Sequence, residues 1–397
     1  MDKVSLFDVL SQAKGKDVNI EKLYNDVMRK KTTDARIPSG VQFELTPICN
    51  FNCKFCYVRM SKNEVEQSGF QIMRFDQWKT YIDEIAKLDT HRLTFSGGEC
   101  TLHPDFIELY RYAYAKGFEM GIITNGSAVT DEIFSMFEEC PPKTISITMY
   151  GMSEETYGKI CGNASAFPKV LKNIERLADR GFKVSLNYTV SKDNLCDLQA
   201  ALDYAAEKHL VILPTGSLFN MGKCERKTLE AEMVEQRELD KVLHRHFSKI
   251  KNMTYDQFEE FFFTGFTEPV RSNEKGLKCD AGRNGFSINW KGFMTPCVSM
   301  DFYQLDPRRL GFRESWKKIV DWANQVPVLE ECNNCIFQTK CLRCVALHYG
   351  DMGEFGKVSP RFCFKVIYPE QAKEIQERYD RMHDEKEADD HPSEKES

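Results

Sequence analysis

Three cysteines in one short segment limit what this chain can fold around. Cys49, Cys53 and Cys56 are separated by three and then two residues, and they follow an alternating apolar run over residues 41–45 that predicts a strand. A short irregular loop can turn all three sulfurs inward, so that they ligate three irons of a four-iron cluster and leave the fourth iron open. The alternative is a zinc knuckle that lacks its fourth ligand. The spacing therefore predicts a metal centre directly after the first strand.

Composition narrows the class of protein. The chain has 397 residues, of which 42% are hydrophobic, enough for a buried core, and its formal net charge of -6 gives no reason to expect nucleic-acid binding. No apolar run is long enough to span a membrane, and the first residues lack the features of a secretory signal. The fifteen cysteines are therefore interpreted as metal ligands rather than disulfides. The expected compartment is the reducing cytoplasm of an anaerobe, without nucleic acid or membrane as a partner.

Strand and helix patterns alternate after residue 40, which predicts an α/β fold with parallel strands joined by helical crossovers. The candidate strands are Val41–Leu45, Arg92–Phe95, Met120–Thr124, Thr144–Met149, Val184–Val190 and Val211–Ser217. The candidate helices between them are Phe75–Leu88, Phe106–Lys116, Asp131–Glu138, Phe167–Arg180 and Leu198–Lys208. In such folds the chemistry lies at the carboxyl ends of the strands, and the cysteine loop follows the first of them.

Glycine and short polar residues occupy the ends of the other candidate strands. The second strand leads into Ser96, Gly97, Gly98 and Glu99, and glycines there let the backbone approach a ligand closely, although an ordinary tight turn is the alternative. Further candidates for polar contacts with a ligand are Thr124 and Asn125 after the third strand, Thr148 in the fourth and Asn187 in the fifth.

The cysteine triplet, followed by the Gly-Gly-Glu segment, resembles the motifs of the radical S-adenosylmethionine (SAM) enzymes. The resemblance implies a partial (β/α)6 TIM-like barrel, in which SAM chelates the open iron and the Gly-Gly-Glu segment holds the SAM amino group. It places Thr124, Asn125, Thr148 and Asn187 beside SAM. The chain departs from the family at Ile160-Cys161-Gly162, where many relatives carry an arginine that meets the SAM carboxylate. Lys159 is a candidate substitute, weighed against a solvated lysine.

Seven more cysteines follow residue 275, namely Cys279, Cys297, Cys332, Cys335, Cys341, Cys344 and Cys363. Their order, with Gly292 five residues before Cys297, resembles the SPASM domain of radical SAM peptide modifiers. Two rather than three residues separate Cys341 from Cys344, and a zinc ribbon is the alternative. The resemblance implies three [4Fe-4S] clusters in all, one that binds SAM and two auxiliary ones. It assigns Cys279, Cys297 and Cys344 to the nearer auxiliary cluster, and Cys332, Cys335, Cys341 and Cys363 to the farther one.

The expected organisation has five parts. They are an N-terminal helical extension over 1–39, the radical SAM barrel over 40–225, a helical linker over 226–275, the SPASM domain over 276–368, and a C-terminal helix with a disordered tail over 369–397, the tail beginning at Asp389.

The resemblance implies a radical SAM peptide maturase. Reductive cleavage of SAM would give a 5′-deoxyadenosyl radical, which abstracts hydrogen from a ribosomally synthesised peptide and leads to a thioether or C–C crosslink. Expected partners are the precursor peptide, a reductant such as flavodoxin or ferredoxin, and a separate leader-binding protein. One alternative is an anaerobic sulfatase-maturating enzyme that generates formylglycine, although Val298 stands where that family has an aspartate, with Asp280 or Asp301 as substitutes. The other is a non-catalytic iron–sulfur electron-transfer protein.

Overall fold

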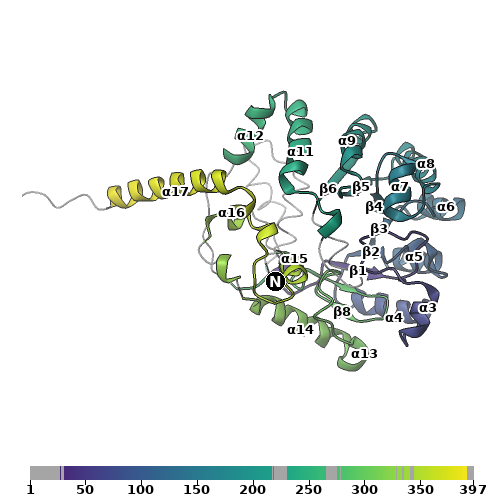
Figure 1. Ribbon diagram of the computed structural model, residues 1–397. Helices are drawn as coiled ribbons and strands as arrows, with labels where there is room; N and C mark the ends of the chain where they lie inside the picture. The colour runs from purple at the N-terminus through teal and green to yellow at the C-terminus, as the bar shows by residue number, and fades with distance from the viewer. Residues whose placement is uncertain are drawn as a thin grey trace, which may run out of the picture.

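The computed structural model describes residues 27, 31–216, 218, 230–264, 275–277, 279–327, 329–332, 335–339 and 344–390. A curved sheet with helices along its outer side forms one half of the molecule in Figure 1, and the C-terminal segment lies against it. Most of the predicted N-terminal extension lies outside the described residues.

Eight strands form one sheet that does not close. They are β1 (Gly40–Glu44), β2 (Arg92–Ser96), β3 (Glu119–Thr124), β4 (Thr144–Met149), β5 (Val184–Thr189), β6 (Val211–Thr215), β7 (Gly285–Ile288) and β8 (Met294–Thr295). Their order is β6-β5-β4-β3-β2-β1-β7-β8, with every pair parallel except β7 and β8. The prediction of an α/β fold built on a partial, six-strand parallel barrel is confirmed, and each predicted strand ends within two residues of the observed one.

Helices follow the strands as crossovers and then build the C-terminal part. The α-helices are α3 (Lys62–Gln67), α4 (Phe75–Ala86), α5 (Phe106–Ala115), α6 (Asp131–Glu139), α7 (Glu154–Cys161), α8 (Ala166–Asp179), α9 (Leu198–Glu207), α11 (Gln236–Ile250), α12 (Tyr255–Thr264), α13 (Pro307–Leu310), α14 (Phe312–Gln325), α15 (Val345–Met352), α16 (Phe364–Ile367) and α17 (Pro369–Asp390). The short 3₁₀ turns are η1 (Cys100–Leu102), η2 (Leu195–Asp197), η3 (Glu330–Cys332), η4 (Ile336–Thr339) and η5 (Pro360–Phe362).

The period-two pattern of the strands decides which side chains reach the barrel interior. In β4, Ile145, Ile147 and Met149 are fully buried in the hydrophobic core, whereas Ser146 and Thr148, which alternate with them, are only partly buried. Burial of each large apolar side chain contributes about 1.5–3 kcal/mol before the entropy cost is counted. The alternation therefore turns short polar side chains toward the centre of the barrel.

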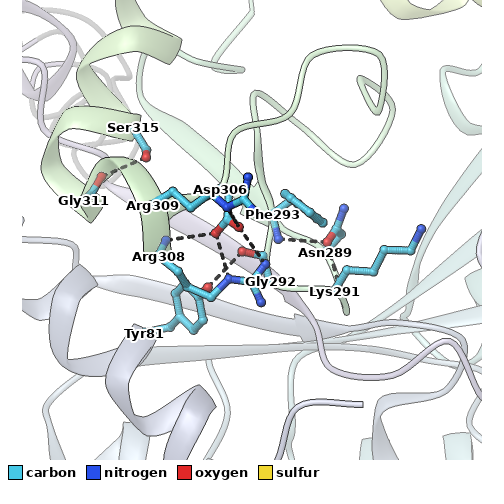
Figure 2. Close-up of polar contacts among 10 residues, drawn as sticks. All are labelled: Tyr81, Asn289, Lys291, Gly292, Phe293, Asp306, Arg308, Arg309, Gly311 and Ser315. Atoms are coloured by element: carbon cyan, nitrogen blue, oxygen red, sulfur yellow. Dashed lines mark hydrogen bonds and ion pairs between the residues drawn. The ribbon is translucent and has the colours of Figure 1, made fainter. Parts of the chain in front are cut away.

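The C-terminal part joins the barrel by extending its sheet. Strand β7 pairs with β1, and the turn after it is held against α4, where the Tyr81 hydroxyl donates to the Gly292 carbonyl at 2.9 Å. Gly292 has φ +85°, and an added Cβ would lie 3.0 Å from the Tyr81 oxygen, so the position requires glycine. The Asn289 side chain accepts two backbone N–H groups within the same turn, and Arg308 binds Asp306 beside it (Figure 2).

The C-terminal helix α17 extends away from the barrel (Figure 1). It continues to Asp390, two residues into the segment that was expected to be a tail. Among the described helices, none combines the length and the apolar character needed to cross a membrane.

Candidate active site and metal centres

The cysteine loop leaves β1 at its carboxyl end and is fastened to the end of α7. The backbone N–H of Asn52 donates to the Cys161 carbonyl at 2.9 Å, and that of Lys54 donates to the Ile160 carbonyl at 3.0 Å. The Lys54 ammonium also pairs with Glu232 at 2.8 Å. The segment that carries arginine in many relatives therefore supports the loop through its backbone here, while the Cys161 side chain is fully buried.

The three thiols of the loop lie close enough to influence one another. Cys49 Sγ accepts the backbone N–H two residues later at 3.4 Å, and Cys56 Sγ accepts the N–H three residues later at 3.3 Å. Burial raises the pKa of Cys49 to about 11 and that of Cys53 well above its usual range, and the negative charge of neighbouring thiolates raises both further. Amide donors of this kind suit thiolates that ligate a metal, since ligation replaces the proton.

The geometry of the thiols bears on which metal group they fit. Within the described ranges, no three His, Cys, Asp or Glu side chains converge closely enough to hold a single metal ion. Cysteine thiolates ligate both iron–sulfur clusters and zinc, so the metal content of the reconstituted protein distinguishes the two.

The two glycines after β2 pack directly against the cysteine loop. The N–H of Gly98 donates to the Thr46 carbonyl at 2.7 Å, and a Cβ at Gly98 would lie 2.6 Å from the carbonyl oxygens of Pro47 and Ile48. Gly97 has φ +148°, and an added Cβ there would overlap the Thr46 carbonyl oxygen. The backbone of this turn can lie this close to the cysteine loop only because neither residue has a side chain. Both glycines therefore have a structural role in addition to the predicted contact with a ligand.

Glu99 is buried and ties the ends of β2 and β3 together. Its carboxylate accepts the Thr124 hydroxyl and the Asn125 backbone N–H, both at 2.7 Å, and the Thr101 hydroxyl at 2.6 Å. Burial raises its pKa, and these hydrogen bonds oppose the rise. The Asn125 side chain in turn donates to Cys49 Sγ at 3.7 Å, so Glu99 positions a side chain that touches the cysteine loop.

A cavity of about 590 Å³ opens at the carboxyl ends of the strands, within the range of small-molecule sites. Most of the predicted residues lie in its wall: Cys53, Cys56, Ser96, Gly97, Gly98, Thr124, Asn125 and Thr148. Cys49, Glu99 and Asn187 are predicted residues that do not line the cavity. Asn187 lies on β5, two residues before Thr189, which does line it.

Sequence reasoning missed six polar wall residues, Gln42, Tyr57, Tyr150, Thr189, Thr215 and Ser299. The alternation of the strands could have found Gln42 and Thr189, because each shares the phase of the inward-facing positions of its strand.

The cavity wall lacks charge in the part of the chain that the structure describes, with no Lys, Arg, His, Asp or Glu among its residues. Lys159 is not near it, since its ammonium pairs with Glu155 at 2.7 Å on the exposed side of α7. A SAM carboxylate in this cavity would therefore meet neutral hydroxyl and amide donors.

The near thiols, Cys279, Cys297 and Cys344, form a second group above the barrel. Burial, together with the charges of Cys344 and Cys279, raises the pKa of Cys297 to about 12. Cys344 lines the cavity together with Val298 and Ser299. This group therefore borders the space that the cysteine loop borders from the other side.

The far thiols form a third group, in which Cys332, Cys335 and Cys363 surround a cavity of about 30 Å³. His348 on α15 lines the same cavity. Cys341, the fourth cysteine predicted for this group, lies outside the described residues. The structure thus groups the six described C-terminal cysteines in the same two sets that the family resemblance assigns.

A buried carboxyl that the sequence did not single out stands beside the cysteine loop. Glu44 in β1 accepts the Tyr57 hydroxyl at 3.2 Å. Burial raises the pKa of Glu44 to about 7, the Tyr57 hydrogen bond lowers it, and the charge of Asp301 raises it. Tyr57 lines the cavity, so the pair lies between the barrel and the C-terminal part.

Comparison with known proteins shows a likeness in sequence and in fold. Residues 43–205 match the model of the Radical SAM superfamily. The fold resembles that of SuiB from Streptococcus suis bound to its precursor peptide SuiA, with a TM-score of 0.58, 12% identity, and coverage of 83% of this chain and 78% of SuiB. Residues 43–205 are therefore similar to the Radical SAM superfamily, and the fold of the chain is like that of SuiB.

Individual relatives are distant and differ in their named activities. The AdoMet-dependent heme synthase of Methanosarcina barkeri is 25% identical over 342 residues, which cover 81% of this chain and 95% of that protein. The sporulation killing factor maturation protein SkfB of Bacillus subtilis is 23% identical over 325 residues, covering 80% of this chain and 72% of SkfB. The chain is therefore similar both to peptide-modifying enzymes and to heme synthases.

Proposed function

We propose that this enzyme matures a ribosomally synthesised peptide by forming a thioether or a carbon–carbon crosslink. The observation that carries the proposal is the two-sided wall of the cavity, with Cys53 and Cys56 on the barrel side and Cys344 on the C-terminal side. A peptide side chain in this space would meet both thiol groups. The likeness to SkfB and SuiB supports a peptide as the substrate.

The cofactors of the proposal are SAM and three [4Fe-4S] clusters. Together with a four-iron cluster, SAM supplies a 5′-deoxyadenosyl radical that removes hydrogen from the substrate. We assign the SAM-binding cluster to Cys49, Cys53 and Cys56, and the two auxiliary clusters to the near thiols and to the far thiols including Cys341. The residues assigned to SAM are Ser96, Gly97, Gly98, Thr124, Asn125, Thr148 and Asn187. Glu99 would position Asn125 by accepting its backbone N–H.

The chain's own residues would bind and orient the substrate. Neutral hydroxyl and amide groups line the cavity, and they can hydrogen-bond to a peptide backbone without the cost of burying an unpaired charge. The proposed partners are the precursor peptide, a flavodoxin- or ferredoxin-type reductant, and a separate leader-binding protein.

A heme precursor is the second candidate substrate, because the similarity to the heme synthase extends over nearly all of that protein. Porphyrins of this kind carry propionate groups, and proteins usually hold carboxylates with Arg or Lys. The described wall has no such residue, which favours the peptide. Formylglycine formation ranks lower, since neither Asp280 nor Asp301 lines the cavity.

Two measurements test the proposal. Anaerobically reconstituted enzyme should bind about twelve irons, and the triple variant Cys49→Ala, Cys53→Ala, Cys56→Ala should lose about four of them together with the formation of 5′-deoxyadenosine. With SAM and reductant, a cysteine-containing peptide encoded beside the gene should lose two hydrogen atoms per crosslink, measured by mass spectrometry. Turnover of an iron porphyrin that carries propionate groups, with no change in the peptide, would replace the proposal by the heme reaction.

A further inference from the structure

A buried histidine lines the same cavity as the far thiols. His348 is 2% exposed, and its Nδ1 accepts the backbone N–H of Ser359 at 3.0 Å. A protonated imidazole has no acceptor nitrogen, so this bond fixes a neutral ring with its proton on Nε2. No group among the described residues accepts a hydrogen bond from Nε2.

The surroundings of His348 restrict what that proton can meet. The cavity of about 30 Å³ that His348 lines is bounded by Cys332, Cys335 and Cys363, by apolar side chains, and by Lys365. Glu331 is the one carboxylate in the described wall, and Asp351, on the same helix, is already bonded to Ser359 and Arg361. Sulfur held by the thiols that line the same cavity could accept this proton and would satisfy a donor that has no acceptor among the described residues.

We propose that His348 donates a hydrogen bond from Nε2 to the iron–sulfur cluster of the far thiols and thereby raises its reduction potential. The inference rests on the proposed assignment of Cys332, Cys335, Cys341 and Cys363 to that cluster. Hydrogen bonds to cluster sulfur stabilise the more negative, reduced state, and they are one of the ways in which proteins set the potential. The alternative is that Nε2 donates to a single water molecule, for which the cavity is large enough.

The test uses the reconstituted full-length enzyme and a redox titration followed by electron paramagnetic resonance. The double variant Cys332→Ala, Cys335→Ala identifies the far cluster by the signal and the irons that it loses. His348→Leu should shift that signal to a lower potential by about tenfold in the ratio of reduced to oxidised cluster, which is about 59 mV for one electron. His348→Gln keeps an N–H donor and should restore most of the potential, whereas His246→Leu, at a buried histidine on α11, should leave it unchanged.

A second measurement needs no variant. Wild-type enzyme that carries histidine with ¹⁵N in the ring should show a nitrogen coupling to the reduced far cluster in pulsed resonance spectra, and its absence would overturn the proposal. An unshifted potential in His348→Leu, or equal shifts in the Leu and Gln variants, would do the same. If the double cysteine variant keeps all of its iron, the cluster assignment fails instead, and the two failures are thereby distinguished.

Discussion

Replacing Glu44 by Gln tests how burial controls charge between the barrel and the near thiols. Glu44 is 5% exposed, and burial raises its pKa from an ordinary value of 4.5 to about 7. Because the pKa in the folded state is above that in the unfolded state, folding favours the protonated carboxyl. The resulting stabilisation is fully present below about pH 4.5 and is lost as the pH rises through about 7.

The size of the effect follows from the two pKa values. They are about 2.5 pH units apart, and each unit is worth 1.36 kcal/mol, so the wild-type chain gains about 3.4 kcal/mol at low pH relative to high pH through this residue. Roughly 1.4 kcal/mol of this falls between about pH 6 and about pH 8.5, where the protein can be measured without strong acid. Glu44→Gln cannot titrate, so it should lack this part of the pH dependence.

The assay is anaerobic denaturant unfolding of the wild type and Glu44→Gln across that range. The variant should gain about 1.4 kcal/mol relative to the wild type between the lower and the higher pH. Glu119→Gln, on a half-exposed side chain that pairs with Lys143, is the matched control and should show no such change. A difference between Glu44→Gln and wild type that is the same at both ends of the range would refute the reasoning.

Three further substitutions test the packing around the site. Gly98→Ala should displace the loop that carries Cys49, because the added Cβ would lie 2.6 Å from two carbonyl oxygens, so the iron bound after reconstitution should fall; Gly158→Ala on α7, with an ordinary contact at 3.5 Å, should leave it unchanged. Glu99→Gln should lower the free energy of unfolding by roughly 1.5–3 kcal/mol, because the new amide nitrogen cannot accept the backbone N–H at that position; an unchanged unfolding midpoint would contradict this. Tyr81→Phe removes the hydroxyl that holds the β7–β8 turn and should lower the free energy of unfolding by about 0.5–1.5 kcal/mol; stability equal to that of the wild type would contradict this.

The sequence predicted the parts of the fold that local pattern specifies. The six barrel strands alternate or cluster apolar residues strongly, and their helices carry long apolar stripes, so periodicity found them. The short elements were missed. Helix α3 has a capping box, with Ser61 and Glu64 exchanging backbone hydrogen bonds, and that Ser-x-x-Glu signature was available in the sequence. Strands β7 and β8 have four and two residues, too few for any periodicity to be recognised.

The site was predictable where one segment supplies the chemistry. The cysteine triplet and the Gly-Gly-Glu turn are local motifs, and both lie at the cavity. The role of Glu99 as a link between strands depends on burial and on partners 25 residues away, and the buried state of Glu44 depends on packing from the C-terminal part. Such properties arise from tertiary structure. The sequence therefore indicated the cysteine triplet and the Gly-Gly-Glu turn, but not the surroundings of Glu99 and Glu44.

The pairing of β7 with β1 has a consequence for how the chain is made. Residues 40–43 find their partners at 285–288, and the neighbouring hydrogen bond between Ser39 and Asn284 spans 245 residues. At about 5–20 residues per second, the ribosome needs roughly 12 to 50 s to deliver the second strand after the first. During that time one edge of β1 has open N–H and C=O groups, which can pair with another chain. The nascent barrel is therefore exposed to aggregation until the C-terminal part arrives, and a fragment that ends before residue 285 keeps that exposure permanently.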